Sequence, residues 1–190
     1  FYVFSGHKIY GPTGIGVLYG KSWALEKLSP YQFGGDMIKT VTVQKTEFAD
    51  IPARFEAGTP PFVEAIGLAA AIRYVSQIGM DTIYGHELEL TKYLLERLRE
   101  IQNIHILGDY PEKQGLVSFN IGSVHPTDLA FVLAKANICT RTGHHCAMPI
   151  HHVFGQQISL RASLGIYNDK GDIDRFIESL HKALYLLGEE

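Results

Sequence analysis

The segment Arg141–Pro149 (RTGHHCAMP) places a cysteine among a glycine, two imidazoles and a proline. The thiolate is the reactive form of cysteine, whose reference pKa is about 8.5, so a nearby imidazolium or backbone dipole raises the nucleophilic fraction at neutral pH. A cysteine that only fills a core does not need such a setting. Cys146 is therefore the first candidate nucleophile.

A lysine follows a short apolar segment at the start of the chain. Phe1–Ser5 (FYVFS) predicts a strand, which leads through a glycine and His7 to Lys8, beside the glycine-containing segment Ile9–Tyr19. A lysine amine can form a Schiff base with pyridoxal phosphate, while Ser5, His7 and the nearby backbone could contact the phosphate. Lys8 is thus a plausible cofactor anchor.

Two further polar residues stand out against their surroundings. Arg161 interrupts the otherwise apolar strand pattern of Ser159–Leu164, and a buried guanidinium needs an anion or several acceptors to balance it. A substrate carboxylate would serve, and a structural ion pair is the alternative. Thr59, in Gly58–Pro61, could cap the helix that follows, or its hydroxyl and amide could contact a phosphate.

Two other patterns favour simpler interpretations. Five potential metal ligands crowd into nine positions, but the adjacent imidazoles at 144/145 and 151/152 cannot easily converge on one tetrahedral ion, so we expect no native metal. The run Gly11–Gly16 has the wrong glycine order for a dinucleotide loop, and a turn into the strand Val17–Tyr19 is favoured.

The composition indicates a globular chain that acts on small molecules. Its 190 residues, 46% of them hydrophobic, suffice for one domain or two small ones with a core. A net charge of −3 offers no basic field for nucleic acid, and no apolar stretch is long enough to span a membrane. Cysteine usage and the absence of a recognisable signal peptide indicate a reducing, cytoplasmic setting. We expect Cys139 to be a half-buried small hydrophobe.

The chain divides into two predicted domains, residues 1–80 and residues 81–190. The first contains a short helix (22–28), an irregular, lid-like loop (about 29–61) with one strand (40–44), and a well-buried helix (62–78). The second is a compact α+β unit with helices at 80–103 and 126–136, strands at 104–107, 116–121, 138–141 and 158–164, and a final helix capped by Asn168 or Asp172. In that final helix the apolar side chains, up to Leu187, are expected to point inward. Because the chain opens without methionine inside an apolar strand, we expect a fragment of a larger protein.

Four ordered motifs together carry a resemblance to a known family. They are Ser5–Gly14, Arg54–Pro60, Arg141–Pro149, and Arg161–Ser163 with Tyr167–Asn168. The chain resembles the C-terminal half of a SufS-type cysteine desulfurase, a class V, fold-type I pyridoxal-phosphate enzyme. The resemblance implies an α/β fold in which an incomplete, cofactor-binding large domain carries the lid-like loop and a small α+β domain carries the cysteine loop.

The resemblance also implies residue roles. Lys8 would hold pyridoxal phosphate, with Ser5 and His7 near the phosphate, and Thr59 would reach the phosphate of the neighbouring subunit in a homodimer. These four residues form the expected cofactor site.

On the substrate side, Arg161 resembles the arginine that pairs with the carboxylate of L-cysteine, and Arg141 lies where the family places a second active-site arginine. Cys146 would attack the substrate sulfur, which releases L-alanine and leaves an enzyme persulfide for iron–sulfur cluster assembly. The expected acceptor of that sulfur is a SufE- or SufU-like protein.

The family also needs an aspartate and a stacked aromatic ring that no motif of these 190 residues supplies. We therefore expect the chain alone to bind the cofactor poorly and to show no turnover. Two alternatives are a selenocysteine lyase of the same family, and a non-catalytic fragment that dimerises or docks a sulfur acceptor.

Overall fold

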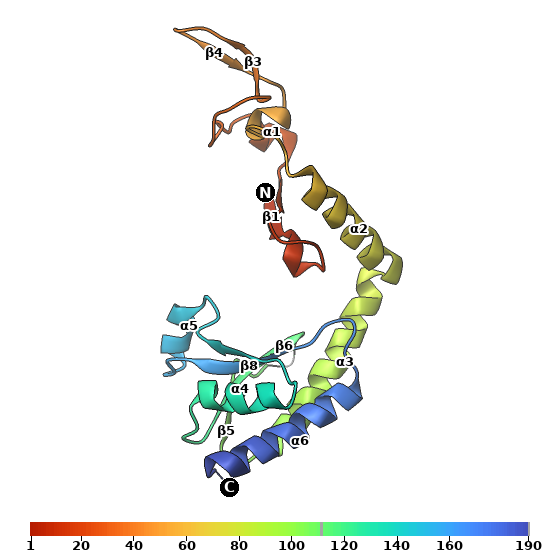
Figure 1. The fold of residues 1–190 in the computed structure, drawn as a ribbon, viewed down its shortest axis with the longest axis vertical. Helices are drawn as coiled ribbons and strands as arrows, with labels where there is room; N and C mark the ends of the chain where they lie inside the picture. The colour runs from red at the N-terminus through yellow and green to blue at the C-terminus, as the bar shows by residue number, and fades with distance from the viewer. Residues whose placement is uncertain (111, 190) are drawn as a thin grey trace. The chain divides into compact units, whose positions relative to one another are not determined.

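The computed structural model describes residues 1–110 and 112–189, which form two compact units. The first unit spans Phe1–Gly79 and the second begins at Met80 (Figure 1). Each unit mixes helices and strands, so the α/β composition predicted from the sequence is confirmed.

The first unit begins with a hairpin that carries Lys8 between its strands. Strand β1 (Tyr2–Ser5) pairs antiparallel with β2 (Gly16–Tyr19), and the 3-10 helix η1 (Gly6–Lys8) follows β1 directly. The remaining elements of this unit are α1 (Ser22–Leu25), β3 (Ile38–Val41), β4 (Thr46–Phe48), η2 (Ala53–Phe55) and α2 (Phe62–Ile78).

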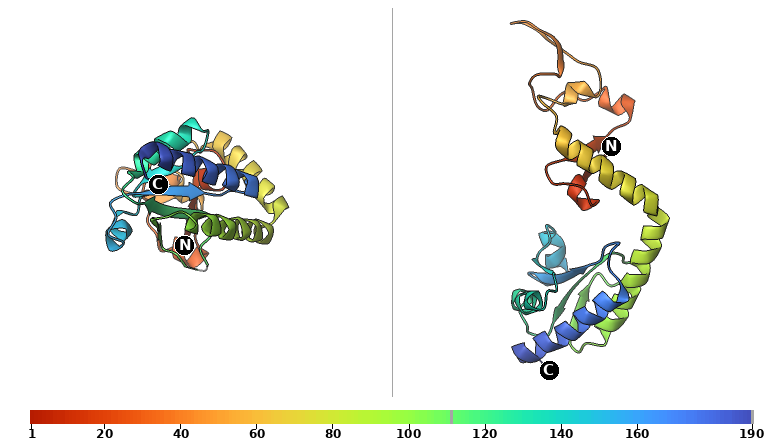
Figure 2. Two further views of the ribbon diagram at one scale, coloured as in Figure 1. Left: turned by 90° about the horizontal axis from the view of Figure 1, so that it is seen from below. Right: turned by 45° about the vertical axis from the view of Figure 1, so that its right-hand side comes forward.

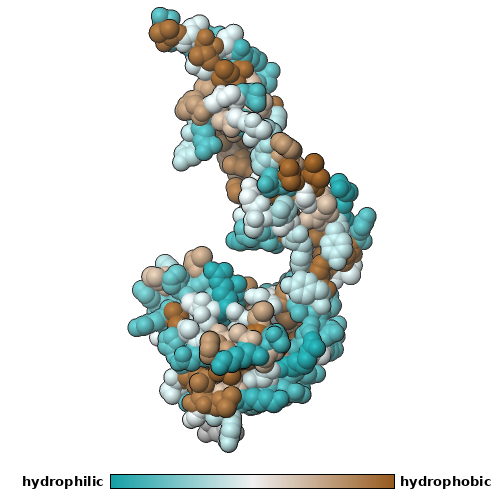
Figure 3. All heavy atoms as spheres, viewed as in Figure 1, coloured by the Kyte–Doolittle hydropathy of each residue, from teal (hydrophilic) through white to brown (hydrophobic). Residues whose placement is uncertain are grey.

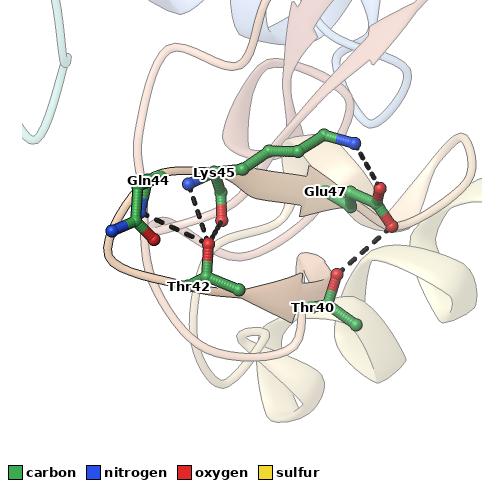
Figure 4. A network of polar contacts seen from close by, with 5 residues as sticks. All are labelled: Thr40, Thr42, Gln44, Lys45 and Glu47. Carbon is green, nitrogen blue, oxygen red and sulfur yellow. Dashed lines mark hydrogen bonds and ion pairs between the residues drawn. The ribbon is translucent and has the colours of Figure 1, made fainter.

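The stretch predicted as an irregular loop contains a second hairpin, β3–β4. The predicted strand at 40–44 is wrong in its second half, because the chain turns at Thr42 (Figure 4). The Thr42 hydroxyl accepts hydrogen bonds from the backbone amides of Gln44 (3.3 Å) and Lys45 (2.9 Å). Thr40 donates to the Glu47 carboxylate across the strands. A side chain that satisfies turn amides in this way competes with continuation of the strand.

Helix α2 has the predicted bounds, but the prediction that it is well buried is wrong. Only Leu68 and Ala71 are buried, whereas the side chains of Val63 and Ile66 are 65% and 68% exposed. Figure 3 shows hydrophobic side chains at the surface along this helix. Helical periodicity indicates an apolar face, but it does not show whether that face is covered. No described residue of the chain covers the apolar face of α2.

The second unit is a four-stranded sheet with three long helices. Strands lie in the order β5 (Ile104–Leu107), β6 (Leu116–Ile121), β8 (Ser159–Ser163) and β7 (Arg141–Gly143), all antiparallel. Helices α3 (Met80–Arg99) and α6 (Lys170–Leu187) pack side by side (Figure 2), and α4 (Pro126–Lys135) contacts α6, β7 and β8. The short helix α5 (Met148–Val153) lies between β7 and β8.

The two faces of this sheet differ in chemistry. Val117 and Phe119 on β6 and Leu160 on β8 join the single hydrophobic cluster formed with α3, α4 and α6. Side chains alternate along a strand, so the residues between them, including Ser159 and Arg161, belong to the opposite face. The core thus fixes the sheet from one side and leaves a polar face for the cysteine segment.

Three details of the second unit correct the sequence predictions. Helix α6 is capped by Asp169, whose carboxylate accepts from the amide of Asp172, while the Asp169 amide donates to the Asp172 carboxylate. Leu187, expected inside, is 37% exposed at the last turn. Cys139 is exposed rather than half-buried, because β7 begins only at Arg141 and leaves Cys139 in the preceding loop.

Candidate active site

The cysteine lies at the tip of a strained loop between β7 and α5. The loop is closed by a hydrogen bond from the Ala147 amide to the His144 carbonyl (2.7 Å), and Cys146 is exposed. His145 and Cys146 have positive φ angles of 52° and 59°. Non-glycine residues in this region cost about 1–3 kcal/mol each and persist only where the surroundings hold them. The backbone conformation that exposes the Cys146 sulfur therefore lowers the stability of the folded state.

A buried hydroxyl lies against this loop on the polar face of the sheet. The Ser159 side chain is fully buried, and its oxygen lies 3.1 Å from His145 Nε2 and 3.0 Å from His151 Nε2. The other nitrogen of His151, Nδ1, lies 3.1 Å from the Ala147 carbonyl oxygen. Both residues that flank Cys146 are thereby tied to β8 or α5.

Two arginines bring positive charge to the same face. Arg141 on β7 and Arg161 on β8 are directly paired in register. The Arg161 Nε donates to Ser163 Oγ (3.1 Å). Burial and then Arg141 lower the pKa of Arg161, whereas interaction with Cys146 raises it. Within the described residues Arg161 forms no ion pair, so the structural alternative finds no support and its guanidinium remains available to a carboxylate.

Burial also acts on the histidine beside the cysteine. It is the largest cause that lowers the pKa of His145, followed by the charges of Arg161 and His151, and an interaction with the Ser159 backbone opposes them. The neutral imidazole is therefore favoured at position 145. The positive charge expected beside the sulfur comes from the arginines rather than from an imidazolium at His145.

A pocket of about 430 Å³ opens on this polar face. Its polar lining includes His145, His151 and Arg161, together with Ser118, Gln114 and Lys113. Lys113 is only 7% exposed, and its amine donates to the carbonyls of Leu107 and Gly108 (3.0 Å to the latter). Desolvation lowers the pKa of this amine, and Asp109 opposes that effect.

Three residues of this region were not singled out for the site from the sequence. Lys113 lies in a segment typical of a solvated turn, and Ser159 looks like an ordinary polar position in a strand. His151 was considered only as a metal ligand. Its spacing from Ala147, one helical turn, was the available signal, but it required knowing that α5 exists.

The Lys8 segment is held by tight backbone geometry within the first unit. The Gly6 carbonyl accepts from the amides of Ile9 and Gly11 (both 3.0 Å), and the Gly6 amide donates to Ile15. A Cβ at Gly11 would lie 2.8 Å from the Gly6 oxygen, so the turn requires glycine there. His7 and Lys8 are exposed, and among the described residues the Lys8 amine has no hydrogen bond or ion pair.

Thr59 lies in the exposed segment between η2 and α2. It does not cap α2, because the N-cap position is Pro61 and no side chain makes a capping bond there. Gly58 has a φ of 81° and donates its amide to the Gly35 carbonyl (2.9 Å). The capping interpretation of Thr59 is therefore wrong, and its hydroxyl is available to a ligand.

The structure thus groups the predicted residues within each unit. Ser5, His7 and Lys8 share one turn of the first unit, and Arg141, Cys146 and Arg161 gather on the polar face of the second. Across residues 1–110 and 112–189, no three His, Cys, Asp or Glu side chains are arranged to hold a metal ion. No helix in that described part is long and apolar enough to cross a membrane.

Comparison with known proteins gives the following matches. The family described as Aminotransferase class-V matches residues 1–176. A probable cysteine desulfurase of Staphylococcus aureus is 48% identical over 184 residues, which are 96% of this chain and 45% of that protein. The chain therefore spans about half the length of the curated relatives it matches.

Solved structures agree with the sequence matches. The cysteine desulfurase CsdA of Escherichia coli is 35% identical with a TM-score of 0.91, over 97% of this chain and 46% of that one. An apo cysteine desulfurase of Thermococcus onnurineus is 38% identical with a TM-score of 0.92, over 96% of this chain and 46% of that one. The fold predicted from the sequence motifs is confirmed by these neighbours.

Proposed function

Since the chain belongs to the aminotransferase class-V family, we propose that a protein carrying it is a pyridoxal-phosphate-dependent cysteine desulfurase of the SufS type. It would take sulfur from L-cysteine and release L-alanine. The observation that carries the proposal is the exposed Cys146, held in a strained loop on the same face as two arginines. A thiol that only stabilised the fold would be buried.

The turn around Lys8 fits pyridoxal phosphate. Its amine is exposed without a partner among the described residues, and the rigid backbone of the turn would hold it in place. The Ser5 hydroxyl and the exposed His7 imidazole lie within three residues of it and could contact the phosphate. Thr59 would contact the phosphate bound by the second subunit of a homodimer. When bound, the cofactor supplies an electron-withdrawing ring that weakens bonds at the substrate α-carbon.

Each candidate site residue would then have a defined role in the reaction. The Lys8 amine would hold the cofactor, and it is the group that would move a proton at the substrate α-carbon. The Arg161 guanidinium binds the substrate carboxylate, and Arg141 adds positive charge beside it.

Cys146 performs the sulfur transfer. Its thiolate attacks the sulfur of L-cysteine, a sulfur–sulfur bond forms, and the carbon–sulfur bond breaks. The electron pair of the broken bond remains on the substrate carbon, which takes up a proton and becomes the methyl group of L-alanine. The sulfur stays on Cys146 as a persulfide, which a SufE- or SufU-like acceptor collects for iron–sulfur cluster assembly.

The large exposed apolar surface of the first unit supports a homodimeric enzyme in which further polypeptide covers it. We propose that the 190 residues alone do not turn over, because no motif in them supplies a partner for the cofactor ring nitrogen. L-Alanine production by the 190-residue chain alone would contradict that part of the proposal.

The test is L-alanine formation by a protein of the relatives' length that carries this chain. We expect Lys8→Ala and Cys146→Ala each to reduce the rate by about 10³-fold or more. Cys139→Ala is the matched control and should leave the rate unchanged. Comparing release from L-cysteine and L-selenocysteine separates a desulfurase from a selenocysteine lyase. Unimpaired cysteine turnover by Cys146→Ala would contradict the proposed role of the thiol.

A further inference from the structure

The hydrogen bonds around Ser159 have only one consistent assignment of protons when both histidines are neutral. The Ala147 carbonyl can only accept, so His151 Nδ1 must carry the proton that it receives. A neutral imidazole protonated at Nδ1 has a bare Nε2, which must accept from the Ser159 hydroxyl. The Ser159 oxygen then accepts from His145 Nε2–H.

This chain of bonds leaves His145 with a bare Nδ1. That atom is buried and has no hydrogen-bond partner among the described residues. Two arginines from neighbouring strands, Arg161 on β8 and Arg141 on β7, and the His151 ring on α5 all act on the His145 ring and lower its pKa. A second proton on the His145 ring would add charge to this cluster, so the neutral form fits its surroundings.

We propose that Ser159 and His151 are positioning residues for Cys146, which together fix His145 as the neutral Nε2–H tautomer and tie the Ala147 carbonyl to α5. Both chain neighbours of the cysteine are then anchored through one buried hydroxyl and one buried imidazole. These hydrogen bonds offset the free-energy cost of two successive residues with left-handed backbone conformations, His145 and Cys146. The catalytic consequence rests on the proposed function, whereas the tautomers do not.

The direct test is nuclear magnetic resonance of the 190-residue chain labelled with ¹⁵N, because long-range proton–nitrogen correlations report which ring nitrogen carries hydrogen. We expect His151 to be protonated at Nδ1 and His145 at Nε2, each singly, at pH 7.5. A His145 ring protonated at Nδ1, or on both nitrogens, would overturn the proposal. This result requires no cofactor and no turnover.

Variants of Ser159 add a second, independent test. Ser159→Ala removes both bonds, so the His145 ring should show a mixture of tautomers, while Ser159→Thr retains the oxygen and should restore the single form. Ser179→Ala, the same change on α6, is the matched control and should leave both rings unchanged. If Ser159→Ala keeps the native tautomers, the proposal is wrong; if that variant does not fold, the spectrum of the unaltered chain still decides.

The catalytic consequence is measured in a protein of the relatives' length. Misplacing a reacting group by about 1 Å can cost about 10²-fold in rate, so Ser159→Ala should lower kcat for L-alanine formation by about 10- to 100-fold. KM for L-cysteine should change little, because Arg161 still binds the carboxylate. Absence of turnover in the unaltered protein would defeat the proposed function without touching the tautomer result, whereas unchanged kcat in Ser159→Ala would defeat the positioning role.

Discussion

The two units hold their candidate residues in different ways. The second unit buries one hydrophobic cluster under its sheet, and that core fixes the polar face on which Cys146 and Arg161 lie. The first unit has few buried apolar side chains, and large ones such as Val63 and Ile66 are exposed. Its Lys8 turn is shaped by backbone bonds and glycines instead. A site can therefore be rigid through packing or through local backbone geometry, and the two should fail differently.

The largest contrast is expected from truncation of apolar side chains. Phe119→Ala in the second unit removes a fully buried ring that packs edge-on against Phe176, and should cost about 3–5 kcal/mol of unfolding free energy. Val63→Ala in the first unit should change it by less than about 0.5 kcal/mol. Urea denaturation followed by circular dichroism measures both. Similar losses of unfolding free energy in the two variants would show that the two units do not differ in how much they depend on packing.

A smaller effect should isolate the backbone of the Lys8 turn. Gly11→Ala places a methyl group 2.8 Å from the Gly6 carbonyl oxygen and should cost about 1–3 kcal/mol of local stability. Gly35→Ala is the matched control, because a Cβ added at Gly35 would meet no atom within 4 Å beyond its chain neighbours. Hydrogen exchange should become faster in β1 and β2 for Gly11→Ala and stay unchanged in the sheet of the second unit. Exchange that rises in both units would contradict independent rigidity.

Removing the cap of α6 should weaken only the second unit. Asp169→Ala removes the carboxylate that accepts from the Asp172 amide, while the backbone amide of residue 169 can still donate to Asp172, and the loss should cost about 1 kcal/mol. Asp109→Ala serves as the matched control, since it removes an exposed pair with Arg99 that contributes little. Exchange rates of α6 amides measure the difference, and equal effects of the two changes would contradict the capping role.

The smallest effect is a pH dependence confined to the cysteine loop. Because the folded state lowers the pKa of His145 below its reference value of about 6.5, the folded protein binds fewer protons than the unfolded chain in that range. The contribution of His145 to the unfolding free energy should therefore be fully present above about pH 6.5 and should be lost as the pH falls through the lowered pKa of the folded state. His145→Asn, which tolerates the left-handed backbone, should show a shallower fall. A fall equally steep in that variant would refute the assignment.

Sequence patterns predicted the parts of this structure that depend on local periodicity. The bounds of α2, the strands β5 and β6, and the exposed cysteine segment follow from apolar spacing and turn residues. Ser159 could not be singled out, because its importance depends on two rings brought to it from a loop and from α5. The strand expected at 40–44 failed because one hydroxyl, that of Thr42, satisfied the turn amides. A contact between elements thus explains why Ser159 was missed, whereas a local side-chain bond explains the wrong strand at 40–44.

We propose that Cys146 receives the sulfur, and peptide mass mapping can locate that sulfur atom on the chain. A protein of the relatives' length that carries this chain would be incubated with pyridoxal phosphate and L-cysteine, digested, and analysed at both cysteines. We expect the peptide containing Cys146 to gain the mass of one sulfur atom and the peptide containing Cys139 to keep its mass. Added sulfur on Cys139 alone, or equally on both cysteines, would contradict it.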